Sequence, residues 1–372
     1  MLKAFVSGFP RYSPRAPIPE IEKALKRVDQ IQSLYLASQK FGMPDWVSEE
    51  LGHLSKIQLD RGALQPLQGA DIFLFYNGCG LKSARRFRQN GGITIVEAVN
   101  SHVRVQEQLM REEYHLLGLP WSPFHRRETR RRIAEVEEAD YILLPSLFVA
   151  RSFLAQGIPA RRLLRVPYPM QKIAGASTTV PKPPPKDDVF RVLYVGTISV
   201  RKGLRYLIEA FRQLKHPKKE LWIVGPTTNA SGLENLSLSE GVKFFGPLKG
   251  DDLQAVYLQA TVFCLPSIED GFGLVLNEAL AYGLPVIATE NTGIEDLMAD
   301  GKGGMVVPIR DADAIGGWLN RLAGDGQFLA AKRQEALATA ARLADPSKST
   351  VTLSGTLMQA FHQHHAKANG ST

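Results

Sequence analysis

The sequence predicts an α/β protein with two doubly wound domains in tandem, and three observations lead to this prediction. Short apolar runs with the length of buried strands alternate with amphipathic stretches of helical spacing, which is typical of a parallel sheet covered by helices on both faces. A proline-rich stretch interrupts the alternation near the middle of the chain, and the alternation then starts again. The length of 372 residues suits two or three domains of about 150 residues.

The first domain is expected to span residues 1–172. Its predicted strands are Ile31–Ala37, Asp71–Tyr76, Ile93–Val99, Tyr141–Pro145 and Leu163–Tyr168. The amphipathic stretches Val103–Leu117 and Pro123–Ala139 predict helices. Ser122 is the expected N-cap of the second helix, with Pro123 at its first helical position.

A linker of extended type is expected over residues 173–188, where Val180-Pro-Lys-Pro-Pro-Pro-Lys-Asp-Asp188 fits neither a helix nor a central strand. The second domain is expected to span residues 189–350. Its predicted strands are Arg191–Gly196, Glu220–Gly225, Val242–Gly246, Thr261–Pro266, Pro285–Thr289 and Gly304–Pro308, with a helix over Leu204–Leu214. A last helix, over residues 351–368, is expected to pack back on the first domain.

Composition excludes several classes of protein. A hydrophobic fraction of 44% and a charged fraction of 22% are near the globular average and exclude disordered, collagen-like and coiled-coil chains. Two cysteines are too few for a disulfide scaffold or a cysteine-built zinc site and fit a reducing cytoplasm. No apolar run approaches the roughly 18 residues that span a bilayer, and the apolar start of the chain is too short for a signal peptide.

The chain carries 45 Lys+Arg against 37 Asp+Glu, a net charge of +8, which favours an anionic partner. Two basic clusters, Lys82–Arg88 and His125–Arg132, lie in the first domain. They are either solvated helix faces or a surface that docks on the anionic inner face of a membrane. Nucleic acid is disfavoured as a partner because no aromatic-interleaved platform or binding motif accompanies the charge.

The loop Gly196-Thr-Ile-Ser-Val-Arg-Lys-Gly203 follows the first strand of the second domain. Ligands of open α/β sheets bind outside the carboxyl ends of the strands, so this loop is a candidate site. Gly203 opens a helix whose first N–H groups and dipole favour an anion. Arg201 and Lys202 add positive charge, which predicts a bound diphosphate; the alternative is a solvated basic turn.

A second candidate loop begins at Pro266 and leads into a helix that stops at Gly283. It carries the adjacent carboxylates Glu269 and Asp270, and Glu278 lies on the helix that follows. The backbone at the helix start is expected to present N–H groups to phosphate oxygens. Glu278 is expected to accept hydrogen bonds from vicinal hydroxyls of a ribose. The alternative is that Asp270 only caps the helix and Glu278 is a surface acid.

These motifs resemble the donor-binding half of the family 4 retaining glycosyltransferases (group 1), which have the GT-B fold of two Rossmann-like domains around a cleft. The resemblance covers Arg191–Pro308. The family motif of Glu, seven residues and Glu is matched by Asp270-Gly-Phe-Gly-Leu-Val-Leu-Asn-Glu278, and Asn291-Thr-Gly-Ile-Glu-Asp-Leu297 also resembles the family. The chain departs from the family at Asp270, which replaces the first Glu, and at Thr197, which replaces an arginine.

The resemblance implies a nucleotide-diphosphate sugar as donor. It implies that Glu278 binds the ribose, Lys202 the diphosphate, and Asp270 (or Glu269) the sugar hydroxyls, with Gly246-Pro-Leu248 near the nucleobase. Arg201 is expected to supply the charge missing at Thr197, and Gly273 and Leu274 to supply main-chain donors. The implied donor-binding residues are Gly196, Thr197, Arg201, Lys202, Gly246, Pro247, Leu248, Glu269, Asp270, Gly271, Phe272, Gly273, Leu274, Val275 and Glu278.

In the first domain, His102 follows the strand Ile93–Val99 and matches in position a family histidine that approaches the donor sugar. The alternative for a lone histidine is a helix cap or a surface group. The Ser7-Gly-Phe9 loop is a further candidate for the cleft. The implied catalytic residues are Asp270, His102, Lys202 and Glu278.

The resemblance implies retaining transfer of a sugar to a saccharide or lipid-linked acceptor in polysaccharide or glycolipid biosynthesis. In such a reaction the leaving diphosphate deprotonates the acceptor, so the protein stabilises charge and positions both substrates. Neither cofactor nor metal is implied; Asp311 and Asp313 are expected to start a helix over Ala312–Leu322. The alternatives are a sugar-nucleotide epimerase of similar architecture and a non-catalytic scaffold.

Overall fold

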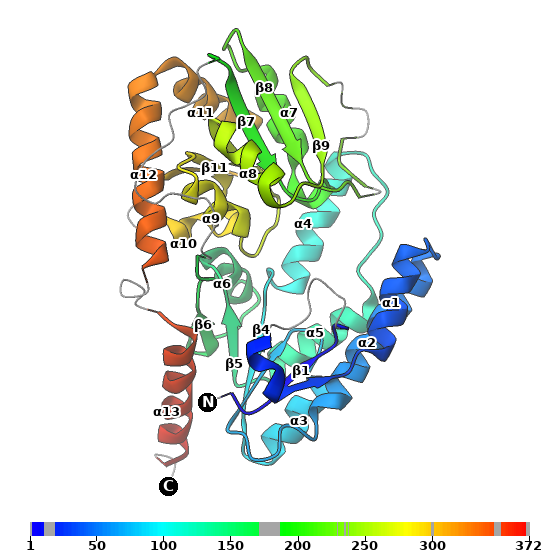
Figure 1. The fold of residues 1–372 in the computed structure, drawn as a ribbon. Coiled ribbons are helices and arrows are strands. Elements are labelled where there is room, and N and C mark those ends of the chain that lie inside the picture. Colours follow the sequence, from blue (N-terminus) through cyan, green and yellow to red (C-terminus); the bar gives the residue numbers. More distant parts are fainter. Residues whose placement is uncertain are drawn as a thin grey trace.

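The computed structural model describes residues 2–10, 19–170, 187–228, 230–233, 236, 238–298, 301–345 and 351–369. Within these residues, parallel strands form a six-stranded sheet, a four-stranded sheet and a separate pair. Figure 1 shows the two larger sheets in separate halves of the molecule, each with helices around it. The predicted α/β class with two parallel-sheet domains is confirmed. Most of the predicted linker, residues 173–186, lies outside the described residues.

The sheet of the N-terminal half runs in chain order, β3-β4-β5-β6. The short strand β1 pairs with β2 in a sheet of their own. The strands are β1 (Phe5–Ser7), β2 (Leu25–Arg27), β3 (Ile72–Tyr76), β4 (Ile93–Glu97), β5 (Tyr141–Leu144) and β6 (Leu163–Arg165). The helices are α1 (Gln30–Lys40), α2 (Asp45–Ala63), α3 (Leu81–Gln89), α4 (Val103–Leu116), α5 (Arg126–Glu138) and α6 (Leu147–Leu154).

The predicted strand Ile31–Ala37 is wrong, because these residues belong to helix α1. Helix α1 packs against α2: the ring of Tyr35 lies beside Gly52, and Ser38 Oγ is 2.9 Å from Ser48 Oγ. A seven-residue apolar run is too short for its periodicity to separate a strand from a helix. Packing against a second helix decides between them.

The predicted start of a helix at Ser122 and Pro123 is also wrong. Helix α5 begins at Arg126, and the Nδ1 atom of its N-cap His125 accepts from the N–H of Glu128. The rings of Trp121 and Phe124 contact each other with centroids 5.7 Å apart in the segment before the helix. That aromatic contact takes the place of the first predicted turn.

The sheet of the C-terminal half has the order β9-β8-β7-β10-β11-β12. The chain therefore builds outward from β7 to one edge and then returns to the other side of β7 with β10. The strands are β7 (Phe190–Val195), β8 (Lys219–Val224), β9 (Val242–Gly246), β10 (Val262–Leu265), β11 (Val286–Thr289) and β12 (Gly304–Val307). The helices are α7 (Leu204–Arg212), α8 (Gly250–Gln259), α9 (Leu274–Ala281), α10 (Ile294–Leu297), α11 (Ala312–Gly324) and α12 (Gly326–Ala344).

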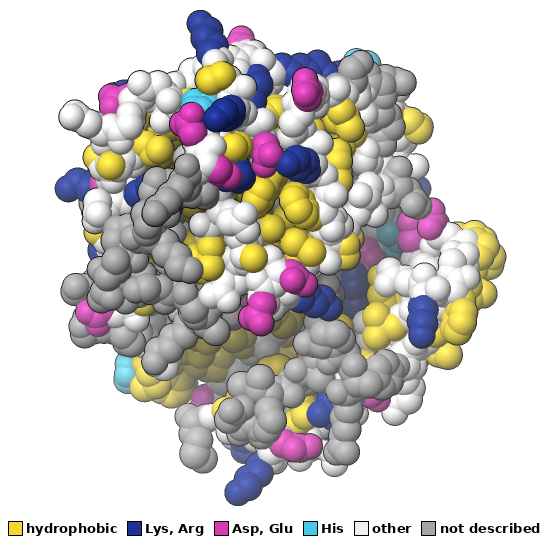
Figure 2. Space-filling view, turned by 45° about the horizontal axis from the view of Figure 1, so that its top comes forward, with side chains coloured by type: hydrophobic (Ala, Val, Ile, Leu, Met, Phe, Trp, Pro, Cys, Tyr) yellow, Lys and Arg dark blue, Asp and Glu magenta, His cyan; other side chains and the backbone are white. Residues whose placement is uncertain are grey.

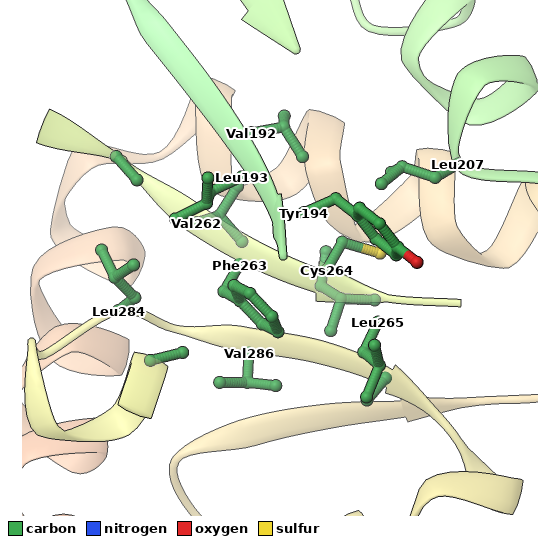
Figure 3. Packing of buried hydrophobic residues seen from close by; sticks show 14 of the residues in the cluster. Val192, Leu193, Tyr194, Leu207, Val262, Phe263, Cys264, Leu265, Leu284 and Val286 are labelled. Carbon is green, nitrogen blue, oxygen red and sulfur yellow. The ribbon is translucent and has the colours of Figure 1, made fainter. Parts of the chain in front are cut away.

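The core of this half is formed by the central strands and the helices on both faces. Val192, Leu193 and Tyr194 of β7 lie beside Phe263 and Leu265 of β10, as Figure 3 shows, and all are fully buried. Strands that are buried on both faces read as continuous apolar runs, which is why the sequence revealed them. The Tyr194 hydroxyl donates to the carbonyl of Thr197 at 2.9 Å and so fixes the loop that leaves β7.

The last helix, α13 (Leu353–Asn369), lies against the N-terminal half in Figure 1. Its Ala360 is buried in one cluster with Ile95 of β4 and Leu143 of β5. No helix among the described residues combines the length and the hydropathy that a membrane span requires.

Candidate functional site

The candidate site lies where the strand order of the C-terminal sheet reverses, between β7 and β10. In doubly wound sheets the loops leaving two such strands diverge and leave a crevice at their carboxyl ends, where ligands bind. The two loops singled out from the sequence, Gly196–Gly203 and Pro266–Gly273, leave these two strands. They touch: the N–H of Ile268 donates to the carbonyl of Arg201 at 2.9 Å.

Gly203 allows this close approach. It caps α7 with φ +60, and a Cβ at this position would come within 2.2 Å of the Pro266 carbonyl oxygen. Both the left-handed backbone and the lack of space require glycine. Lys202, in the 3-10 turn Val200–Lys202, is thereby held at the start of α7.

Lys202 and Asp270 form an ion pair across the two loops, and both side chains are 13% exposed. The N–H of Asp270 donates to the Asn291 carbonyl at 2.9 Å, which fixes the acid at the end of β10. The predicted diphosphate lysine and the predicted sugar-binding acid are therefore neighbours. The positive ends of the α7 and α9 helix dipoles lie at this ion pair.

Glu278 lies on α9, two turns beyond Asp270, and is half-buried. Its Oε2 accepts from the hydroxyl of Tyr257 on α8 at 2.8 Å. Burial, followed by the charge of Glu278, raises the pKa of Tyr257, so this residue remains a hydrogen-bond donor. Tyr257 was not among the residues predicted from the sequence, because its position on α8 is typical of a core tyrosine.

Of the two backbone N–H groups predicted as ligand donors at the start of α9, one is hydrogen-bonded within the protein and the other is not. The N–H of Gly273 donates to the Thr292 carbonyl at 2.9 Å, so the structure engages this predicted main-chain donor internally. No described residue accepts from the N–H of Leu274, whose side chain is 47% exposed. The amide of Leu274 is thus the one of the predicted pair that remains open to a ligand.

Glu269 does not face the site as an open acid, although the sequence left it as an alternative to Asp270. It is fully buried. Its Oε1 accepts from the N–H and hydroxyl of Ser101, and its Oε2 accepts from Gln106 at 3.0 Å. Arg201 forms an ion pair with the same carboxylate at 3.1 Å. Glu269 therefore joins the two halves of the molecule, and Arg201 is engaged by this carboxylate within the C-terminal half.

His102 is the N-cap of α4 and is 4% exposed. Its Nδ1 accepts from the N–H of Arg104, and its ring meets Phe153 edge-on at 5.1 Å. Burial lowers the pKa of His102 to about 4, and the positive charges of Arg104 and Arg132 act in the same direction. The imidazole is therefore neutral near pH 7, with its proton on Nε2.

Residues 189–325 match the family described as glycosyl transferases group 1. The C-terminal domain belongs to the group 1 glycosyltransferases. Among relatives, D-inositol 3-phosphate glycosyltransferase of Corynebacterium jeikeium is 34% identical over 140 residues, which are 33% of this chain and 33% of the relative. Sulfoquinovosyl transferase of Arabidopsis thaliana is 30% identical over 176 residues, 45% of this chain and 34% of the relative. The match thus covers about a third of these relatives' own length.

Solved structures extend the likeness of fold to both halves of the chain. Sucrose-phosphate synthase of Thermosynechococcus elongatus has a TM-score of 0.62 at 20% identity, over 86% of this chain and 79% of that one. Anabaena HepE in complex with UDP-glucose has a TM-score of 0.56 at 18% identity, over 85% and 82%. The fold is GT-B, as these neighbours show.

The remaining predicted residues lie on strand ends, loops and a helix of the C-terminal half. Gly196 and Thr197 follow β7, and Gly246, with φ +67, ends β9 before Pro247 and Leu248. Val275 is half-buried on α9. The ring of Phe272 is 7% exposed and meets Tyr168 edge-on, so the structure places it in packing.

Within the described part of the chain, no three or more His, Cys, Asp or Glu side chains gather into a metal-ligating cluster. The side chain of Asp311 caps α11 by accepting from the N–H of Ala314 at 2.8 Å. The expected start of this helix is confirmed.

Proposed function

We propose that the chain transfers a sugar, with retention of anomeric configuration, from a nucleotide-diphosphate donor to a saccharide or lipid-linked acceptor. The observation that carries the proposal is the arrangement of Lys202, Asp270 and Glu278 at one crevice. A cation and the starts of two helices lie together at the switch point, beside a carboxylate that a buried tyrosine orients. This set suits a ligand that combines a diphosphate with vicinal hydroxyls.

In this proposal, different groups of the site bind different parts of the donor. Lys202 and the open N–H of Leu274 bind diphosphate oxygens, and Glu278 accepts from the ribose hydroxyls. Asp270 leaves Lys202 in part when the diphosphate arrives and accepts from sugar hydroxyls. The residues after β9, Gly246 to Leu248, lie near the nucleobase.

The reaction requires no protein base in this proposal. As the sugar–phosphate bond breaks, charge builds up on the diphosphate, where Lys202 and the helix starts stabilise it. The diphosphate takes the proton of the acceptor hydroxyl, which forms the new bond on the same face of the sugar. Neutral His102 lies on the N-terminal side of the cleft and hydrogen-bonds the donor sugar. The proposed reaction uses no metal, so transfer should persist in excess EDTA.

A thermal-shift screen against UDP, GDP and ADP tests donor binding first. A nucleotide at a hundred times its Kd should stabilise the native chain by about 2.7 kcal/mol. Glu278→Gln should abolish this stabilisation and the transfer, whereas Glu290→Gln, which alters an exposed acid nearby, should change neither. Loss of the donor sugar without an acceptor would favour an epimerase. No affinity for any of the nucleotides would favour a scaffold.

Proton NMR of the transferred sugar tests the stereochemistry. Retention predicts that the anomeric coupling constant of the product matches that of the donor. Inversion would refute the retaining mechanism and leave the donor site intact.

We also propose that the chain binds the cytoplasmic face of an anionic membrane through its N-terminal half. Support comes from residues 41–46, which comprise the connection between α1 and α2 and the start of α2: Phe41 is 78% exposed, Met43 48% and Trp46 72%. The start of the basic cluster His125–Arg132 lies beside them, since Arg127 pairs with Glu50 of α2 at 3.1 Å. In the other cluster, Arg85 and Arg88 are likewise paired, with Glu138 and Asp140.

A further inference from the structure

Arg132 is a half-buried cation for which the described residues provide no ion pair. Its Nε donates to Oδ1 of Asn77 at 3.1 Å, and Asn77 in turn donates to the Arg132 carbonyl at 3.0 Å. These bonds hold the stem of the side chain. They leave the two terminal nitrogens of the guanidinium without a hydrogen-bond partner among the described residues.

The nearby carboxylates are all engaged elsewhere. Glu128 binds His53 and Lys56. Glu135 accepts from the N–H groups of Gly78, Gly80 and Leu81 and pairs with Arg131. Glu269 binds Ser101, Gln106 and Arg201. Burial lowers the pKa of Arg132, and these three acids act in the opposite direction.

Arg132 lies between elements that face the cleft. Asn77 and Gly78 follow β3, and Gly78 lies closely under Arg132: a Cβ there would be 3.7 Å from Arg132 Cγ and 3.8 Å from Lys56 Cδ. The guanidinium also interacts electrostatically with His102, at the start of α4, and with Glu269 of the C-terminal domain. Figure 2 shows a hollow beside the lobe of α1 and α2, with lysine or arginine and histidine side chains at its wall.

A buried charge without a partner costs several kcal/mol of stability. Such a residue is typical of a functional site, where a bound ligand offsets this cost. A guanidinium with free terminal nitrogens matches the two oxygens of a phosphate or carboxylate. The ammonium of Lys56 lies on the same side, is 38% exposed and is shared with Glu128.

We propose that Arg132, assisted by Lys56, binds an anionic group, a phosphate or carboxylate, on the acceptor. The assignment of this anion to an acceptor rests on the proposed transferase function, whereas the anion site itself does not. Arg132 belongs to the N-terminal half, whereas the diphosphate of the donor is assigned to Lys202 in the other domain. The anion at Arg132 is therefore a second one, next to His102 and opposite the motif loop.

Thermal unfolding of the full chain in inorganic phosphate, at constant ionic strength, tests the anion site. The experiment uses Lys202→Gln as background, so that phosphate at the donor site does not contribute. Phosphate should raise the melting temperature of this background and of Lys202→Gln/Arg130→Gln, which removes an exposed arginine from the same helix. For Lys202→Gln/Arg132→Gln, the phosphate concentration needed to reach the same rise in melting temperature should be at least about tenfold higher. Arg132→Lys in the same background should restore part of the effect.

Two outcomes overturn the anion site: an equal phosphate effect with and without Arg132, or no phosphate effect in the Lys202→Gln background. Arg132→Gln should also leave the melting temperature in phosphate-free buffer unchanged or higher, because it removes a charge that has no ion pair among the described residues. A fall there with the phosphate effect intact would mean that Arg132 is structural.

Steady-state kinetics then assign the anion to its substrate. Arg132→Gln should raise the KM for the acceptor about tenfold or more and leave the KM for the donor unchanged. A rise in the donor KM alone would place the anion on the donor and overturn the acceptor assignment. If no transfer occurs at all while phosphate binding depends on Arg132, the proposed function fails and the anion site stands.

Discussion

Individual side chains in this site depend on partners far along the chain. Glu278 is positioned by Tyr257, which lies 21 residues earlier on another helix. Glu269 meets Ser101 at a separation of 168 residues. A carboxylate with one orienting hydrogen bond keeps its other oxygen for a ligand, whereas one with four donors has none to spare. This difference separates Glu278 from Glu269, although both were candidates in the sequence.

Tyr257→Phe should weaken donor binding about three- to tenfold, because one hydrogen bond to a charged group is lost and the carboxylate is less well oriented. The control is Tyr282→Phe. The Tyr282 ring stacks on Tyr257 at 5.1 Å, but its hydroxyl donates to no described residue. Calorimetric titration with the nucleotide found in the screen measures the effect. Equal affinities of the wild type and both variants would show that Glu278 needs no orientation.

His102 should make the stability of the chain depend on pH. Its pKa falls from a usual value of about 6.5 to about 4 on folding. Between these values the unfolded chain binds a proton that the folded chain does not, so stability is complete above pH 6.5 and falls as the pH approaches 4. The loss is on the order of 3 kcal/mol.

His102→Asn provides the comparison, because asparagine can also accept from the N–H of Arg104 at an N-cap. Urea unfolding at about pH 7 and about pH 4.5 should show a smaller loss of stability in the variant. If the difference between variant and wild type is the same at both values, His102 does not have the lowered pKa.

Helices and strands were predictable to different degrees. Fully buried strands such as β7 and β10 were found because their apolar runs are continuous and bounded by glycine or proline. The starts of α7, α9 and α11 were found from Gly203, Gly273 and Asp311, whose chemistry is local. Helix α1 was mistaken for a strand because its identity depends on packing against α2, which no local pattern contains.

Residues 41–46, the connection between α1 and α2 with the start of α2, should determine membrane binding. Phe41→Ser/Trp46→Ser should reduce binding to anionic phospholipid vesicles at least about tenfold, since two large exposed apolar side chains would no longer enter the interface. Leu353→Ser is the control: Leu353 is also exposed, at 43%, but α13 lies on the other side of the molecule in Figure 1. Co-sedimentation with anionic and neutral vesicles measures the effect. Equal binding of the wild type and the double variant would refute docking through this connection.

At the scale of the whole molecule, the motif loop both forms the donor site and joins the two halves. Glu269 binds Ser101, and the Gly271 carbonyl accepts from the Ser146 hydroxyl at 2.7 Å. Nearby, Asp296 pairs with Arg165 and accepts from the N–H of Leu147 at 2.8 Å. The sequence predicted two domains and a cleft, but it could not place these contacts, because the loop motif is as compatible with an open crevice as with a closed one.

Gly271→Ala should separate the two halves. Gly271 has no left-handed backbone conformation, so only space restricts it: a Cβ would lie 1.8 Å from the carbonyl oxygen of Val99, which follows β4. Since real Cβ contacts below 3.0 Å are essentially absent, the loop and Val99 must move apart, and the hydrogen bonds of Glu269 and Ser146 across the cleft weaken. Stability should fall by about 1–3 kcal/mol, the usual cost of overpacking.

The effect on function distinguishes a general loss of stability from a specific loss of closure. Because Lys202, Asp270 and Glu278 all belong to the C-terminal domain, Gly271→Ala should bind nucleotide nearly as well as the wild type. Its transfer rate should fall at least about tenfold, since positioning of the acceptor against the donor depends on the opposite domain. Small-angle X-ray scattering should show a larger radius of gyration.

The control is Gly317→Ala, at an exposed position of α11 with nothing within 4 Å of the added Cβ. This variant should stabilise the chain by about 0.5–1 kcal/mol. A wild-type transfer rate in Gly271→Ala would show that the closed arrangement is not required for catalysis.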